Sequence, residues 1–348
     1  MQQSSERVIT GRALLGEDLQ EEDVSITVSG GIITSIEPVS RPSGLWIVPA
    51  FFNAHTHLGD TVAMDIPARG SLADLVKPPN GLKHRILAET PRADLVRGMR
   101  ASINAMIATG TAGFADFREG GVDGVAALRE AAAGLDCHPV ILGRDGGEMV
   151  SDGAGISSVH DMKNAEEVVR GARAAGKLVA FHAGEKNLDD IDDALTFEPD
   201  LLVHCTHATE GQLRCIVDMG IPIAVCPRSN WVLGVTASPA YPPIARILKL
   251  GGTLYLGTDN VMFVQPDLLQ EMAFTSTVYR VTPEEILRAA IAGARLAGIS
   301  GYLEERQSAH FLVIDPSRVN LSFSRDIRAT IVKRLDSSSI GQNILTLQ

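Results

Sequence analysis

The middle of this chain alternates between short apolar segments and helix-like segments, and the alternation repeats eight times. The apolar segments indicate strands; they are the run ending at His57, then 111–117, 139–143, a weaker one at 153–159, 178–182, 201–204, 221–226 and 253–257. Helical periodicity lies between them, as at 93–108, 165–175, 209–219 and 283–297. Alternating strands and helices imply a parallel sheet, and eight such units predict an α/β fold built on a closed (β/α)₈ TIM barrel.

Both ends of the chain carry further β structure. Segments 8–10, 24–28 and 32–36 are short and rich in β-branched residues, and Ser29-Gly30-Gly31 forms the turn of a hairpin between the last two. Near the C-terminus, 311–314 and 329–332 have the same character. We therefore expect strands at both ends of the chain, outside the barrel.

Composition limits the classes of partner. The 348 residues are 45% hydrophobic and carry a net charge of -11 without a basic cluster, which disfavours nucleic acid and favours a small-molecule substrate. No apolar run spans a bilayer and no signal segment is apparent, so we expect no membrane partner and a cytoplasmic location. The four cysteines form no Cys-x-x-Cys pair, which disfavours a zinc ribbon or a thioredoxin-type site.

Polar residues fall at the ends of the predicted strands, where barrel enzymes place their sites. Each has an ordinary explanation alone, as a core histidine or a turn residue, but their joint placement indicates a site. They are His55 and His57 at the first strand, His182 with Glu185 at the fifth, His204 at the sixth and Asp259 at the eighth. His55 and His57 are two apart, so both imidazoles leave one face of their strand.

Three histidines and one carboxylate suit a divalent metal, zinc first and iron next. A metal with an open coordination position lowers the pKa of a water molecule and supplies hydroxide near neutral pH. Asp259 can then contact the metal and accept the water's proton, and Glu185 can carry a proton to a ring nitrogen and to the leaving amine. His204 can stay unligated and polarise the attacked centre.

Five stretches of the sequence resemble motifs of the amidohydrolase superfamily. Within that superfamily they resemble the aminohydrolase branch, with its cytosine, S-adenosylhomocysteine and chlorohydrolase-type enzymes. They are PAFFNAHTH at 49–57, FHAGE at 181–185, HCTH at 204–207, CPRSN at 226–230 and LGTDN at 256–260. The resemblance implies that His55, His57, His182 and Asp259 bind the metal. It also implies that Glu185 is the proton-shuttling glutamate of the deaminases and that His204 is a catalytic histidine.

The resemblance carries two further expectations. A small β-sandwich would form from residues 1–48 and 301–348, around a catalytic barrel at 49–300. Members with two metals use a modified lysine on the fourth strand, and residues 139–160 contain no lysine. We therefore expect one divalent metal per chain.

Substrate contacts are expected from the loops that follow the strands. The candidates are Arg118, Arg144, His207, Arg228 and Trp231, of which Trp231 can stack on a flat ring. Solvated loop charge is the alternative for the arginines, and a structural role is the alternative for His207. The Gly- and Pro-rich segment 58–85, with Arg69 and the run 77–81, is a candidate lid or pocket wall.

These features predict a metal-dependent hydrolytic deaminase that releases ammonia from an amino-substituted heteroaromatic ring, a purine, pyrimidine, pterin or nucleoside of these. The alternative is a mononuclear amidohydrolase that acts on a cyclic amide or a ring carbon–halogen bond. A metal-binding protein without catalysis is disfavoured, because it would need the ligands but not Glu185. The sequence leaves open the amine, any sugar, the physiological metal and the oligomeric state, a homo-oligomer included.

Overall fold

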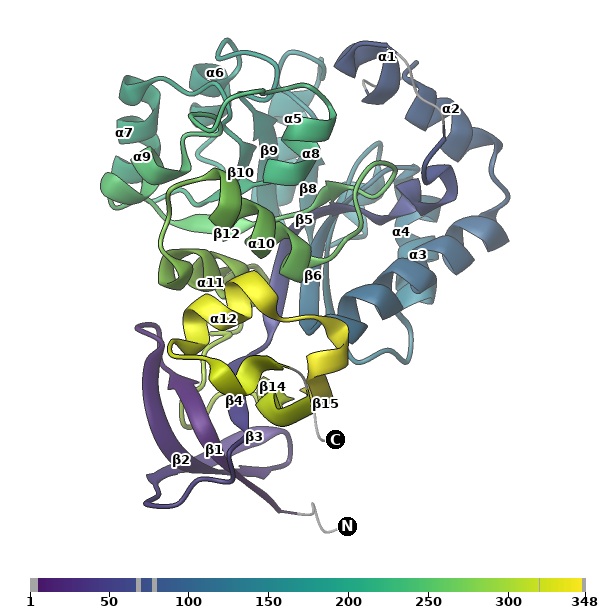
Figure 1. The fold of residues 1–348 in the computed structure, drawn as a ribbon. Coiled ribbons are helices and arrows are strands. Elements are labelled where there is room, and N and C mark those ends of the chain that lie inside the picture. Colours follow the sequence, from purple (N-terminus) through teal and green to yellow (C-terminus); the bar gives the residue numbers. More distant parts are fainter. Residues whose placement is uncertain (1–5, 67–69, 77–79, 319, 346–348) are drawn as a thin grey trace.

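The strands predicted in the middle of the chain form one sheet in which every neighbouring pair runs parallel (Figure 1). This computed structural model describes residues 6–66, 70–76, 80–318 and 320–345. The sheet consists of β5 (Phe51–His57), β6 (Thr111–Arg118), β7 (His138–Gly143), β8 (Gly153–Ile156), β9 (Leu178–Ala183), β10 (Leu201–His204), β11 (Ile223–Val225), β12 (Leu254–Leu256) and β13 (Asp259–Asn260). The predicted strands are confirmed to within a few residues at each end.

The sheet closes through its last segment. β12 pairs with β11, and β13, three residues later, pairs with β5 at the opposite edge, with Asp259 beside Thr56. Between them the Gly257 N–H donates to the Val225 carbonyl at 3.0 Å, and the Thr258 N–H donates to the His55 carbonyl at 3.0 Å. One segment therefore bonds to both edges, and the eight predicted strand positions form a barrel.

Gly257 lies at this closure because only glycine fits there. A Cβ added to it would lie 2.7 Å from the Cβ of His55 and 2.9 Å from the backbone nitrogen of His55. A glycine inside a strand often marks such a close approach of two backbones. The eighth strand can therefore pass directly beside the strand that carries His55 and His57.

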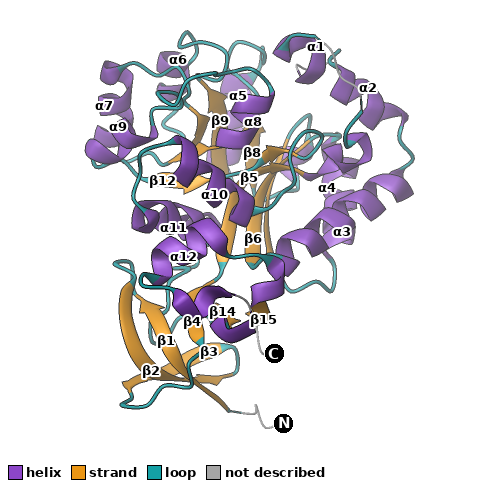
Figure 2. Ribbon diagram, in the orientation of Figure 1, coloured by secondary structure: helices purple, strands orange, loops and turns teal. Residues whose placement is uncertain are grey.

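Helices surround the barrel and cover its outer face (Figure 2). Sequence signals set some of their ends: α11 begins at a capping box between Thr282 and Glu285, with Pro283 in its first turn. The helices are α1 (Leu72–Val76), α2 (Leu82–Glu89), α3 (Arg92–Ala108), α4 (Gly121–Ala132), α5 (Ala165–Ala174), α6 (Ile191–Leu195), α7 (Glu210–Asp218), α8 (Pro227–Val232), α9 (Ile244–Lys249), α10 (Leu268–Val278), α11 (Pro283–Ala292) and α12 (Ile327–Arg334). Short 3₁₀ turns lie at Leu58–Ala63, Gly147–Met149, Gly293–Ala297, Pro316–Arg318, Asn320–Phe323 and Ser337–Ser339.

The two ends of the chain meet in a second sheet, which lies below the barrel in Figure 1. Its order is β15-β14-β4-β1-β2-β3, and its strands are β1 (Arg7–Leu15), β2 (Gln20–Ser29), β3 (Ile32–Pro38), β4 (Trp46–Pro49), β14 (His310–Ile314) and β15 (Ile340–Leu345). β1 and β4 run parallel, and the other pairs are antiparallel. The described residues thus join the ends in one mixed sheet rather than in two stacked sheets.

One terminal strand was predicted wrongly. Residues 329–332, expected as a strand, lie inside helix α12, which packs against α10 and α11. The Asp326 side chain begins this helix by accepting a hydrogen bond from the Ala329 N–H at 3.1 Å. The C-terminal residues therefore contribute to the cover of the barrel as well as to the terminal sheet. The division into 1–48 with 301–348 and 49–300 remains a proposal.

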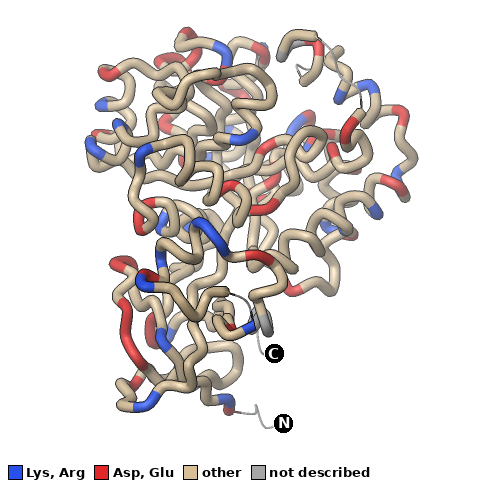
Figure 3. Tube along the Cα trace, viewed as in Figure 1, with Lys and Arg blue, Asp and Glu red and all other residues tan. Residues whose placement is uncertain are grey.

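Charged residues of both signs are spread over the described chain (Figure 3). Lys and Arg are interspersed with Asp and Glu along the described chain, with a run of acidic residues on β2 (Figure 3). Among the described helices, none combines the length and the apolar character that crossing a bilayer requires.

The terminal sheet should be a strong contributor to stability, and Phe311 tests this. Its ring extends from β14 and is fully buried in a cluster that includes Ile26 and Ile47. Phe311→Ala should lower the free energy of unfolding by about 3–5 kcal/mol, measured by denaturant titration. Phe323→Ala is the matched control, because that ring is 88% exposed. Equal stability of the two variants would contradict the prediction.

Candidate active site

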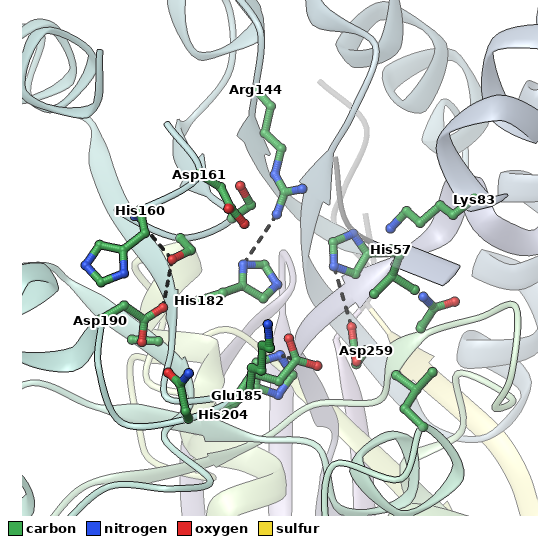
Figure 4. Close-up of a pocket in the computed structure, with 18 residues that line it drawn as sticks. His57, Lys83, Arg144, His160, Asp161, His182, Glu185, Asp190, His204 and Asp259 are labelled. Atoms are coloured by element: carbon green, nitrogen blue, oxygen red, sulfur yellow. Dashed lines mark hydrogen bonds and ion pairs between the residues drawn. The ribbon is translucent and has the colours of Figure 1, made fainter. Parts of the chain in front are cut away.

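The polar residues predicted at the strand ends converge on one cavity of about 230 Å³ (Figure 4). Its lining includes His57, His182, Glu185, His204 and Asp259. His55 is fully buried, with its ring centroid 4.8 Å from that of His182. The structure therefore brings together all six residues of the predicted metal and catalytic set.

Four of these residues form a group that could hold a metal ion. Ligating atoms of His55, His182, His204 and Asp259 all lie within 4.8 Å of one another. His57 lies at the edge of this group, with its Nε2 3.5 Å from Asp259 Oδ1. The predicted ligand set named His57 and left His204 unligated. The geometry brings both close to Asp259, and their division of roles remains a proposal.

Backbone carbonyls fix the orientation of two imidazoles. His57 Nδ1 lies 3.2 Å from the Phe117 carbonyl, and His182 Nδ1 lies 3.1 Å from the Ile156 carbonyl. A histidine that donates its Nδ1 proton to a carbonyl keeps the Nε2 lone pair free for a metal. Both rings therefore present Nε2 as the atom that can bind a metal.

The protonation states also suit a cation. Burial lowers the pKa of His55 to about 4 and that of His57 to about 3, and burial also places the pKa of His182 well below its usual value. Burial alone would raise the pKa of Asp259, but the hydrogen bond from His55 and the nearby imidazoles hold it well below the ordinary range. Three neutral imidazoles and a carboxylate are the forms in which these side chains bind a divalent metal.

The backbone at two of these residues is unusual. His204 has φ of 75° and Asp259 has φ of 62°, in the left-handed region that few non-glycine residues adopt. The Asp259 carboxylate is further held by Ser229, whose hydroxyl donates to Oδ2 at 2.6 Å. Such strained positions persist where surrounding structure fixes them, and they gather at functional sites.

Glu185 lies in the loop after β9, beside His204. Its Oε1 is 3.7 Å from His204 Nε2, and its side chain is 20% exposed. Burial raises the pKa of Glu185, an effect that the nearby His204 opposes. A raised pKa favours the protonated form that a general acid needs.

The predicted substrate contacts separate into two groups. Arg144 lines the cavity, where its Nη2 lies 3.3 Å from His182 Nδ1. The other four are absent from the described lining: Arg118 bonds to Glu119, Arg228 to Glu271, Trp231 donates to the Tyr279 hydroxyl, and the His207 ring lies near Tyr241. Their roles in binding remain predictions.

Several lining residues were not singled out from the sequence, and Lys83 is one of them. Lys83, on α2, is only 3% exposed and lines the cavity together with Val76, which partly agrees with the expectation that segment 58–85 forms a pocket wall. Arg69 and residues 77–79 of that segment lie outside the described residues. A lysine in a polar, Gly- and Pro-rich stretch gives no local sign that it will be buried.

Comparison with known proteins assigns the family. An amidohydrolase family model matches residues 46–173, and an adenosine deaminase model matches residues 150–310. A protein of Methanothermobacter thermautotrophicus, provisionally named an aminohydrolase, is 35% identical over 96% of each chain. This chain belongs to the amidohydrolase superfamily. It is an aminohydrolase of that superfamily, as the sequence motifs predicted.

Two further matches show which named proteins this aminohydrolase is similar to. A 5-methylthioadenosine/S-adenosylhomocysteine deaminase of Pelotomaculum thermopropionicum is 26% identical over 95% of this chain and 89% of its own length. The crystal structure of an adenosine deaminase from Xanthomonas campestris with bound zinc superimposes with a TM-score of 0.76 at 15% identity, covering 96% of this aminohydrolase and 90% of that chain. The second match concerns the fold alone.

The metal content should be close to one divalent ion per chain. Elemental analysis of purified protein checks this number. His55→Ala should lose the metal, because it removes a fully buried donor from the centre of the group. His160→Ala is the control, since that half-exposed imidazole pairs with Asp193 outside the group and its loss should leave the metal in place. Two tightly held ions per chain would overturn the mononuclear site.

Proposed function

We propose that this aminohydrolase is a mononuclear metal-dependent deaminase that hydrolyses the amino group of a heteroaromatic ring and releases ammonia. The observation that carries the proposal is the position of Glu185, a carboxyl group beside His204 at the wall of the buried histidine and aspartate cluster. Displacement of a ring halide can proceed without a proton carrier, whereas ring deamination needs one on the substrate side for the ring nitrogen and the leaving amine. The similarity to named deaminases supports the same reaction.

The proposed ligands are His55, His57, His182 and Asp259, with zinc as the first candidate and iron as the second. The X. campestris structure with bound zinc supports this order. When bound, a divalent metal with an open position lowers the pKa of a water molecule and makes a hydroxide nucleophile available near neutral pH.

The side chains around the ligands then have separate tasks. Asp259 accepts the proton of the attacking water, and the Ser229 hydroxyl at 2.6 Å fixes the carboxylate for that step. Glu185 gives its proton to a ring nitrogen as the water adds, which makes up for the loss of aromaticity. It then takes up the proton of the added hydroxyl group and delivers it to the leaving amine as the C–N bond breaks, and the proton held by Asp259 returns to Glu185. His204, 3.7 Å from Glu185, polarises the attacked carbon from the same side.

The cavity wall favours a polar substrate. Its lining includes Ser158, His160, Asp161, Asn187 and Asp190, and the described lining contains no Phe, Tyr or Trp. Ring recognition would then rest on hydrogen bonds to ring edges and substituents rather than on stacking. Ammonia release from a panel of aminopurines, aminopyrimidines, aminopterins and their nucleosides tests the proposal, and a panel without any turnover would contradict it.

Glu185→Gln separates deamination from simpler hydrolysis. The amide keeps the size of the side chain but cannot deliver a proton, so the rate on an amine substrate should fall about 10²-fold or more, about 3 kcal/mol of barrier. Metal content should not change, because Glu185 is not among the proposed ligands. Steady-state kinetics and metal analysis on the same samples measure both.

The matched control for this variant is Glu130→Gln, which alters an exposed glutamate paired with Arg92 on the outer helices. It should keep normal turnover. A Glu185→Gln variant with near-normal turnover would remove the proton carrier from the proposal and leave hydrolysis without it as the better account.

A further inference from the structure

A buried chain of contacts leads from helix α2 to the histidine cluster. The Lys83 ammonium lies 2.8 Å from Glu119 Oε1, and the same oxygen lies 3.0 Å from His57 Nδ1. The three side chains are 3%, 7% and 5% exposed. In Figure 4 the ammonium of Lys83 points toward His57. The proposed reaction does not use this chain of contacts.

The Glu119 carboxylate is fixed from its other side as well. Arg118 Nη2 bonds to Glu119 Oε2 at 2.6 Å, so the two oxygens have separate partners. Lys83 is itself anchored by Asp60 Oδ2 at 2.9 Å. The cation nearest to the oxygen that faces His57 is therefore Lys83, which comes from α2.

Lys83 is one of three cations in this network. Three cations, Lys83, Arg118 and Arg144, face three carboxylates, Asp60, Asp116 and Glu119. Removing one partner from a buried network leaves an uncompensated charge, which moves toward whatever partner remains. Without Lys83, Oε1 of Glu119 would be drawn toward Arg144, whose Nη1 is 3.6 Å away.

We propose that Lys83 is a positioning residue of the metal centre, which acts through Glu119 to hold the His57 imidazole in its metal-binding orientation. A carboxylate on the second ring nitrogen of a metal-bound histidine sets the ring orientation and raises its basicity. Here that carboxylate is held by a residue outside the barrel strands. The inference rests on the proposed metal site and adds a residue that none of the motifs contains.

Lys83→Met tests this inference, because it keeps most of the length of the side chain and removes the charge. Transfer of metal from the purified holoenzyme to a chelator of known affinity should show binding that is about 10- to 100-fold weaker. Arg85→Met is the matched control on the same helix, since Arg85 is exposed and should keep wild-type affinity. Lys83→Met combined with Asp60→Asn gives a second variant that removes one charge of each sign and so protects folding.

A double-mutant cycle with Glu119→Gln shows whether Lys83 acts through Glu119. The two substitutions should weaken metal binding by less together than the product of their separate effects. Independent, multiplicative effects would overturn the relay. So would a Lys83→Met enzyme with wild-type metal affinity and a raised KM, because Lys83 would then be a substrate contact. A wild-type protein that holds no metal would instead overturn the proposed function itself.

Discussion

Closure of the parallel sheet through residues 254–260 is the constraint on which the active site depends. His55 and Asp259 are 204 positions apart in the chain, yet Nε2 of one lies 3.2 Å from Oδ1 of the other, because β13 pairs with β5. The same closure sets the distance from the carboxylate to His57. A sheet that stayed open at this edge would leave the histidines of the first strand without their carboxylate.

Burial determines the chemistry that this arrangement can perform. It lowers the pKa of His55, His57 and His182, while the hydrogen bond from His55 and the nearby imidazoles hold the pKa of Asp259 well below its ordinary range. Within the cluster, a carboxylate surrounded by neutral donors is complemented by a divalent cation. The cationic residues of the neighbouring network cannot fill that role, since carboxylates such as Asp60 and Glu119 already engage them. The site thus has two parts. In the network, cations and carboxylates pair with each other, whereas the histidine and aspartate cluster still attracts positive charge.

The sequence predicted the barrel and the six central residues because their signals are local. Strands buried on both faces read as apolar runs, and a polar residue that ends such a run is conspicuous. Residues 329–332 were predicted as a strand because a short apolar run is compatible with a strand or with a helix. The Asp326 cap was the sign of a helix that the prediction missed. Arg228 was expected at the substrate, but its partner Glu271 lies 43 residues away. Lys83 was missed for the same reason, since burial and pairing depend on tertiary contacts.

Gly257 limits how the eighth strand can evolve. In most of a protein core a larger side chain is accommodated by small shifts of its neighbours. At this position the atoms that would have to shift are the Cβ and backbone nitrogen of His55, at 2.7 and 2.9 Å from an added Cβ. A shift of these atoms would therefore change the positions of the metal-binding atoms in the cluster. A side chain at this position would therefore disturb the active site together with the packing of the barrel.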